Sequence, residues 1–227
     1  MEFLQQAFDY FRHLDVHLAD MLRQYGAWTY AILFLIIFCE TGLVVTPFLP
    51  GDSLLFAAGA ITAAANNQPG EQQALSIIIL WLVLMVAAVL GDTVNYHIGR
   101  AVGLRVFKED ARVMKLEYLR RTEKFYAKYG GKTIILARFI PIVRTYAPFV
   151  AGASRMDYPR FLSFNIIGGV VWITSFLFAG YFFGNIPAVK HNFEYVVIGI
   201  IFVSIIPPIL EWLKHRREQR AAEPTQA

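Results

Sequence analysis

Residues 133–154 constrain this chain more than any other stretch, because an apolar segment here contains two arginines and two prolines. Arg138 and Arg144 are its only charged residues, and Pro141 and Pro148 interrupt a regular helix. An arginine at the centre of a membrane helix costs about 2.5–3.5 kcal/mol on insertion scales. Irregular backbone is tolerated at membrane depth where protein surrounds it or where it lines a polar cavity. The stretch therefore predicts a hairpin that enters the membrane and returns to the same side.

The composition predicts an all-α integral membrane protein. The chain has 227 residues, of which 56% are hydrophobic and only 17% charged, against roughly 25% charged in soluble domains. Basic residues gather at 100–132, with ten Lys and Arg against four acids, and again at 214–220. The positive-inside rule places both regions, and therefore the C-terminus, in the cytoplasm. Nucleic acid is not an expected partner, because these charges flank membrane spans.

The pattern of apolar residues divides the chain into three parts. Apolar residues at three- and four-residue steps near the N-terminus predict an amphipathic helix in the plane of the membrane interface. The predicted boundaries are an interfacial helix at 1–27, a membrane domain at 28–213 and a basic tail at 214–227. Within the domain we expect re-entrant hairpins at about 28–65 and 133–153, and spans at about 74–98, 161–184 and 195–213.

The first hairpin carries the opposite charge to the second. Glu40 and Asp52 are its only charged residues, and Pro47, Pro50 and Gly51 fall between them at the expected tip. Two ordinary helices joined by a loop are the alternative interpretation. The two hairpins resemble each other weakly and are expected to enter from opposite sides, which predicts an inverted repeat. In transporters such repeats place the binding site at the membrane midplane.

Four charged residues therefore form the candidate site. Arg138 and Arg144 are the expected phosphate-binding residues, because guanidinium groups bind phosphate bidentately and stay charged. Glu40 and Asp52 are expected counter-ions or proton carriers, because burial disfavours the charged form of a carboxyl group. The structural alternative is a pair of buried salt bridges that pin the hairpins together.

Further residues have shaping or gating roles in this interpretation. The residues expected to shape the hairpin tips are Pro47, Pro50, Gly51, Pro141 and Pro148. Asp92, Tyr96 and Arg100 share one helix face near the end of the span 74–98, which predicts either a surface ion pair or a gate. The four tryptophans, including Trp172, mostly fall near span ends, as interfacial anchors do.

Several chemistries are missing from the sequence. It contains no GxxxxGK[ST] motif for an ATP-driven pump, no HExxH or paired-cysteine metal motif, and no Gly-x-Ser-x-Gly nucleophile turn. Cys39 is the single cysteine. We therefore expect no cofactor, no metal and no enzymatic activity.

Four motifs make the chain resemble the DedA family, whose domain also occurs in eukaryotic lipid-scrambling proteins. They are Glu40-Thr-Gly, Phe48-Leu-Pro-Gly-Asp-Ser-Leu-Leu55, Gly91-Asp-x-x-x-Tyr-x-x-Gly-Arg100 and Ala137-Arg-Phe-x-Pro-x-x-Arg-Thr-x-Ala-Pro-Phe-x-Ala-Gly152. The resemblance covers about residues 28–213. It implies a multi-pass protein of the bacterial inner membrane that returns undecaprenyl phosphate across the bilayer. It also implies that Glu40, Asp52, Arg138 and Arg144 are essential.

The expected function is therefore a flippase for undecaprenyl phosphate or a related phospholipid, linked to the proton motive force. Its expected partners are a membrane lipid and protons, and a homo-oligomer stays open. The first alternative is a proton-coupled transporter of a small ion that supports membrane-potential or pH homeostasis. The second is a lipid-phosphate phosphatase, for which the sequence offers no convincing nucleophile or metal set.

Overall fold

The computed structural model describes residues 24–43, 51–66, 75–107 and 116–184, together with the single positions 20, 186, 187, 189, 195, 196 and 199. Every regular element in these residues is helical, which confirms the all-α prediction for this part of the chain. The predicted helix 1–27, span 195–213 and tail 214–227 lie almost wholly outside the described residues. So does the segment 44–50, which contains Pro47 and Pro50.

Seven α-helices and two short 3-10 helices make up the described chain. In order they are α3 (Trp28–Gly42), α4 (Gly51–Asn66), α5 (Ile77–Val102), η1 (Leu104–Val106), α6 (Leu116–Tyr129), η2 (Gly130–Lys132), α7 (Thr133–Ala137), α8 (Pro141–Ala153) and α9 (Tyr158–Phe183).

Among these helices, α5 and α9 are long and apolar enough to cross a membrane, at 26 residues each. Such a helix is about 39 Å long, which exceeds the roughly 30 Å hydrocarbon core of a bilayer. α5 ends before Gly103, whose φ of 77° suits glycine. The helix therefore runs to Val102 rather than to the predicted residue 98, and Asp92 lies well inside it. α9 begins at Tyr158 rather than 161, with a proline in its first turn.

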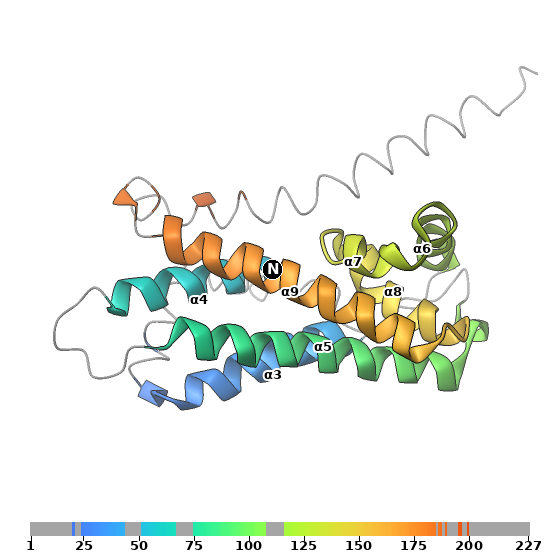
Figure 1. Cartoon of the computed structure of the whole chain (residues 1–227), viewed down its shortest axis with the longest axis horizontal. Helices are drawn as coiled ribbons and strands as arrows, with labels where there is room; N and C mark the ends of the chain where they lie inside the picture. The colour runs from blue at the N-terminus through green and yellow to red at the C-terminus, as the bar shows by residue number, and fades with distance from the viewer. Residues whose placement is uncertain are drawn as a thin grey trace, which may run out of the picture.

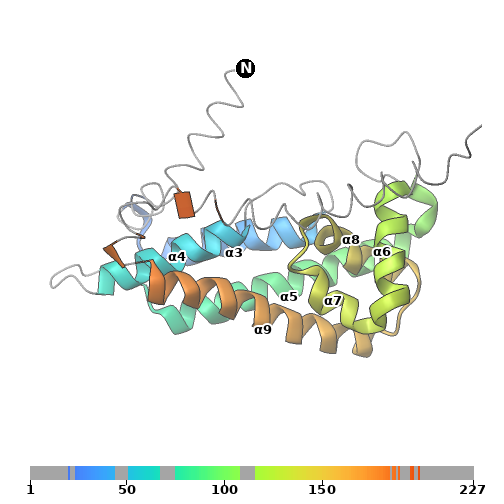
Figure 2. The same cartoon turned by 90° about the horizontal axis from the view of Figure 1, so that it is seen from above.

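The short helices divide between the two ends of the molecule. α5 and α9 run along its length, α3 and α4 cover one half, and α6, α7 and α8 cover the other (Figure 1). The view from above shows the same division (Figure 2). α4 packs on α9 and α8 packs on α5, whereas α3 packs on α5 and α7 on α9. Each long helix therefore contacts short helices from both halves.

Glycines allow the closest of these contacts. A Cβ atom on Gly180 of α9 would lie 1.9 Å from the Phe56 carbonyl oxygen of α4. A Cβ atom on Gly152 of α8 would lie 1.9 Å from the Tyr96 carbonyl oxygen of α5. Only glycine permits backbones to approach this closely, so the α4–α9 and α8–α5 pairs use the same device.

The outer face of α5 carries a continuous apolar stripe. These exposed residues recur at four-residue steps and are Ile78, Leu82, Val86, Leu90, Val94, Ile98 and Val102. A stripe of this length on a 26-residue helix suits contact with lipid tails. The opposite face of the helix packs into the core through residues such as Leu80 and Leu84.

The basic segment forms the amphipathic helix α6, which lies beside α8. Its apolar face packs on α8 through Leu119, and the Tyr126 hydroxyl donates to the Ala147 carbonyl oxygen at 2.9 Å. Arg120 and Lys124 are exposed on its other face. α6 therefore supports the helix that carries Arg144.

Candidate functional site

Five charged side chains are buried where the short helices approach each other between α5 and α9. Glu40 lies near the end of α3, Asp52 at the start of α4, Asp92 within α5, Arg138 just after α7 and Arg144 in the first turn of α8. Each is at most 8% exposed. The two hairpin stretches that carry the candidate charges in the sequence therefore meet, with Asp92 as a fifth member.

Arg144 joins both arms of the first hairpin stretch. Its Nη2 lies 2.5 Å from Glu40 Oε1, and its Nη1 lies 2.9 Å from Asp52 Oδ1. The backbone N–H of Gly51 also donates to Glu40 Oε1, at 3.2 Å. A Cβ atom on Gly51 would lie 2.0 Å from Glu40 Oε2, so a larger residue at this position would displace the Glu40 carboxylate. Gly51 thus lets α4 begin directly beside the acid at the end of α3.

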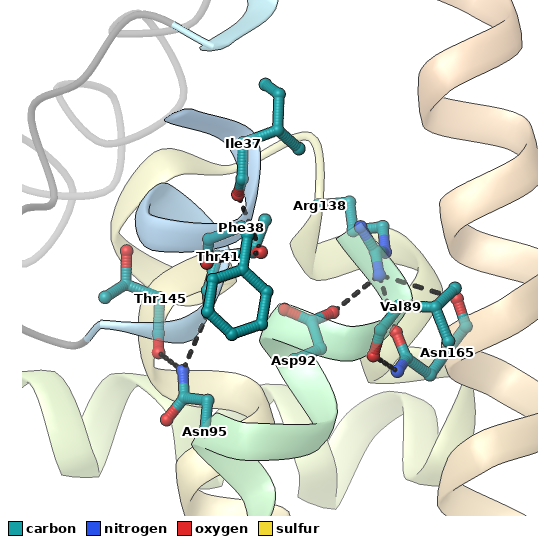
Figure 3. Close-up of polar contacts among 9 residues, drawn as sticks. All are labelled: Ile37, Phe38, Thr41, Val89, Asp92, Asn95, Arg138, Thr145 and Asn165. Atoms are coloured by element: carbon teal, nitrogen blue, oxygen red, sulfur yellow. Dashed lines mark hydrogen bonds and ion pairs between the residues drawn. The ribbon is translucent and has the colours of Figure 1, made fainter. Parts of the chain in front are cut away.

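Arg138 is held differently, by one carboxylate and one amide. Its Nη2 lies 2.6 Å from Asp92 Oδ2 and 2.5 Å from Asn165 Oδ1 (Figure 3). Its Nε and Nη1 are buried and have no hydrogen-bond partner among the described residues. These two nitrogens carry three of the five N–H donors of a guanidinium group. Arg138 therefore keeps donors for which the described protein supplies no acceptor.

Two glycines on α9 make room for Arg138. A Cβ atom on Gly168 would lie 3.1 Å from both Cδ and Nε of Arg138, and one on Gly169 would lie 3.7 Å from its Nη2. The first distance is tighter than an ordinary contact, which is about 3.5–4.0 Å between carbon atoms. Gly168 and Gly169 therefore allow the buried Arg138 side chain to lie against α9.

Trp172 touches both arginine sites. Its side chain is fully buried, and its Nε1 donates to Asp52 Oδ1 at 2.8 Å. Its ring centroid lies 5.1 Å from Arg144 Cζ and 5.8 Å from Arg138 Cζ, within the range of cation–π attraction. The interpretation of Trp172 as an interfacial anchor is therefore wrong. The sequence alone does not reveal the charged partners that surround Trp172.

Asn95 and Asn165 are further buried polar residues that the sequence interpretation did not assign to the site. Asn165 accepts from Arg138 and donates through Nδ2 to the Val89 carbonyl oxygen at 3.0 Å. Asn95 lies on α5 three residues after Asp92 and is fully buried. Both are polar residues within apolar spans, and that signal could have identified them.

The three residues proposed as a gate do not act as one group. Asp92 pairs with Arg138, so the surface ion pair expected near the end of the span is wrong for this residue. Tyr96 instead donates its hydroxyl to the Met156 carbonyl oxygen, and Arg100 donates to the Tyr96 hydroxyl at 3.4 Å. The reason is the longer course of α5, which places Asp92 among buried partners.

The prolines also separate into different positions. Pro141 is the first residue of α8, where its missing N–H has no helical partner to lose. Pro148 lies inside α8, so it does not shape the turn before that helix as expected. Inside a helix it instead removes the N–H that would bond the carbonyl of Arg144.

The charged cluster consists of acids paired with arginines. No group of three His, Cys, Asp or Glu side chains suited to a metal occurs in the residues that the structure describes. Three carboxylates face two guanidinium groups, which gives two positive and three negative charges and a net charge of −1 when all are ionised. Buried ion pairs are weak devices for stability, because desolvation offsets much of their attraction.

Comparison with known proteins gives consistent matches over most of the chain. Residues 49–182 match the model of the VTT domain. Protein DedA of Escherichia coli K12 is 50% identical over 96% of this chain and 97% of its own length. The membrane protein Rv0364 of Mycobacterium tuberculosis H37Rv is 43% identical over 84% of this chain and 81% of its own length.

A more distant relative is named as an inner membrane protein. The inner membrane protein YqjA of E. coli K12 is 36% identical over 70% of this chain and 69% of its own length. No solved structure matches the chain significantly. The resemblance drawn from the sequence motifs is confirmed.

Proposed function

We propose that this chain, which belongs to the DedA family of VTT-domain membrane proteins, carries a phosphate-bearing lipid across the bacterial inner membrane. The proposed cargo is undecaprenyl phosphate or a related phospholipid, as the family resemblance implies. The observation that carries the proposal is Arg138, a buried guanidinium whose Nε and Nη1 have no hydrogen-bond partner in the part of the chain that the structure describes.

Arg138 supplies the anion-binding group in this proposal. A buried donor without an acceptor costs about 1–3 kcal/mol, and more when it is charged. A phosphate oxygen placed at Nε or Nη1 removes this penalty and adds charge-assisted hydrogen bonds.

Arg144 has a second role, as a lock between the short helices. Both of its terminal nitrogens are paired with carboxylates, one on α3 and one on α4. Cargo must displace one of these acids before it can use the same donors. We therefore propose that Arg138 binds the phosphate first and that the Glu40–Arg144 pair opens as the lipid passes.

The charge of the cluster supports coupling to protons. With all five groups ionised the cluster already has an excess of one negative charge, and a phosphate adds more. Low-dielectric surroundings make this excess costly, so uptake of a proton by a carboxylate favours cargo binding. We propose Glu40 and Asp52 as the carriers of these protons.

The membrane arrangement that we propose is an inverted repeat. The short helices α3 and α4, and likewise α7 and α8, would form re-entrant hairpins that enter from opposite sides and meet at the charged cluster. The matching glycine contacts of the α4–α9 and α8–α5 pairs support this symmetry. The exposed basic residues of α6 favour the cytoplasm for that end of the molecule, and we place the C-terminus on the same side.

One observation favours a small ion as a second candidate cargo. The five charged residues are buried, and each is at most 8% exposed to solvent. A buried site of this kind suits an ion that passes entirely through protein. Lipid transport instead needs a lateral opening that keeps the polyprenyl tail in the bilayer.

The test uses purified protein in liposomes that contain undecaprenyl phosphate. A membrane-impermeant phosphate-binding probe reports how fast outer-leaflet lipid becomes inaccessible, with and without a pH gradient. The variants are Arg138→Lys, Arg144→Lys and Glu40→Gln, each checked for folding. Arg120→Lys, an exposed arginine on α6, is the matched control.

Lipid movement by the wild type and the control that is slower in the folded variants supports the proposal. Stimulation by a pH gradient assigns the acids to coupling. Uptake of inorganic phosphate without lipid movement favours the small-ion candidate, and release of phosphate identifies a phosphatase. Normal lipid movement in all three variants shows that the cluster is structural.

A further inference from the structure

Asn95 forms a hydrogen-bonded bridge between the two groups of short helices. It is fully buried on α5, and its Nδ2 donates to the Thr41 carbonyl oxygen at 3.3 Å and to the Thr145 carbonyl oxygen at 2.9 Å (Figure 3). Thr41 belongs to α3 and Thr145 to α8. One amide nitrogen therefore contacts helices from both halves of the molecule.

Both hydrogens of the Asn95 side-chain amide are used in these two bonds. A side-chain NH₂ group offers two donors, and both are used, one for each helix. Thr41 lies in the last turn of α3, where carbonyl groups lack an intrahelical partner. The Thr145 carbonyl lies within α8 but has a second lone pair for the amide. Separation of α3 from α8 therefore breaks at least one of these bonds.

The bridge lies beside the Glu40–Arg144 ion pair. Thr41 follows Glu40 and Thr145 follows Arg144, so the backbone atoms held by Asn95 adjoin both charged partners. The ion pair and the amide close one ring that runs through α3, α5 and α8. A movement that opens the ion pair must also strain the amide contacts.

Close packing surrounds the Asn95 bridge. A Cβ atom on Gly91, one turn before Asn95, would lie 2.8 Å from the Phe38 carbonyl oxygen and 3.0 Å from the Gly42 nitrogen, so the backbones of α3 and α5 approach closely there. The Thr41 hydroxyl is directed into its own helix and donates to the Ile37 carbonyl oxygen at 2.9 Å. Because α8 also packs closely on α5 through Gly152, a movement that separates α3 from α8 breaks either the bond to Thr41 or the bond to Thr145.

We propose that Asn95 is a positioning residue that holds α8 against α3 and so controls how readily the Glu40–Arg144 pair opens to cargo. This inference rests on the proposed function, and it concerns the regulation of the same site. Arg138 binds the phosphate while the pair is closed, and the lipid passes only when the pair is open, so the fraction of open protein scales the maximal rate of transport. Loss of this clamp, the two Asn95 hydrogen bonds to Thr41 and Thr145, raises the fraction of open protein.

The test compares Asn95→Leu and Asn95→Ala, which both lack the amide donors but differ in bulk. Thr174→Val is the matched control. It removes the 2.9 Å hydrogen bond from Trp81 Nε1, which joins α5 to α9 and involves none of the short helices. In the liposome assay, loss of one or two hydrogen bonds raises the maximal rate of lipid movement per folded protein roughly three- to tenfold, at an unchanged half-saturating lipid concentration. The control leaves the maximal rate unchanged. A purely structural role for Asn95 would instead lower the amount of folded protein and leave the rate per folded protein unchanged.

A second measurement does not depend on cargo. Amide hydrogen exchange is followed in the same proteins without lipid phosphate. We expect faster exchange at the end of α3 and the start of α8 in both Asn95 variants, with the rest of the molecule protected as in the wild type. Unchanged exchange in these two helices, or a uniform loss of protection, overturns the clamp. If the wild type moves no lipid but the local exchange effect is present, the transport proposal fails and the clamp stands.

Discussion

Arg138 and Arg144 are buried in the same cluster and flank the same tryptophan, yet the protein satisfies them differently. Arg144 faces two carboxylates, Glu40 on α3 and Asp52 on α4. Arg138 faces one carboxylate, Asp92, and an amide, and its Nε and Nη1 have no partner among the described residues. Both terminal nitrogens of Arg144 are paired with carboxylates, whereas Arg138 uses only its Nη2.

This difference suggests a division of labour. A guanidinium between two acids on separate helices joins those helices, and its donors become free only when the helices move. A guanidinium with spare donors is ready to bind an anion without such movement. Substitutions that affect the two arginines unequally are therefore the most informative.

The largest expected effect is on stability. Asp92→Asn leaves Arg138 as a buried charge without a counter-charge, which costs about 3–5 kcal/mol. Asp52→Asn leaves Arg144 paired with Glu40, so we expect a smaller loss of about 1–3 kcal/mol. The fraction folded after heating in detergent measures both, with the exposed Glu123→Gln as a control. Equal losses at Asp92 and Asp52 would remove the asymmetry between the two sites.

The next effect separates binding from turnover. Arg138→Lys keeps the charge beside Asp92 but loses the planar donors, so the half-saturating lipid concentration should rise about tenfold. Arg144→Lys should change mainly the maximal rate, because its donors are committed to Glu40 and Asp52. Concentration series in the liposome assay measure both quantities. The reverse pattern would mean that Arg144 is the anion-binding residue.

A smaller effect tests the link between the sites. Trp172→Phe removes the hydrogen bond to Asp52 but keeps an aromatic ring near both guanidinium groups, at a cost of about 1 kcal/mol. Trp81→Phe removes a comparable bond to Thr174 outside the cluster and is the matched control. We expect similar losses of stability but slower transport only for Trp172→Phe. Equal transport by the two variants would make Trp172 a packing residue.

The smallest effect concerns the space beside Arg138. Gly168→Ala places a methyl group 3.1 Å from Arg138 Cδ and Nε, so the side chain must shift by a few tenths of an ångström. Gly169→Ala meets Val89 at 3.3 Å and Arg138 only at 3.7 Å. We expect a modest, roughly two- to threefold weaker lipid affinity for Gly168→Ala alone, as a loss of about 0.5 kcal/mol implies. An equal effect of both variants would show that the space beside Nε is not used.

The sequence identified most of the charged cluster because charges are conspicuous in apolar stretches. Glu40, Asp52, Arg138 and Arg144 could all be selected in this way. Their pairing could not be derived, because the partners are 92 and 104 residues apart for Arg144. It depends on which helices pack together, and one sequence does not determine that.

The other buried residues of the cluster show a second limit. Asp92 is selected from the sequence as a surface ion-pair or gate residue near the span end, because the polar residues after it suggest that the helix stops there, whereas α5 continues to Val102. Trp172, Asn95 and Asn165 carry no charge, and neutral polar or aromatic residues are common in membrane helices. Their roles depend on partners from distant helices, which are visible only in the fold.

The most direct measurement is the position of the phosphate relative to the two guanidinium groups. Solid-state NMR on ¹⁵N-arginine-labelled protein in liposomes with undecaprenyl phosphate detects dephasing between the lipid ³¹P and side-chain nitrogens. We expect dephasing in the wild type and in Arg144→Lys, and its loss in Arg138→Lys. Dephasing that survives Arg138→Lys but disappears in Arg144→Lys would contradict the division of labour. Its absence from the wild type would contradict phosphate binding at the cluster.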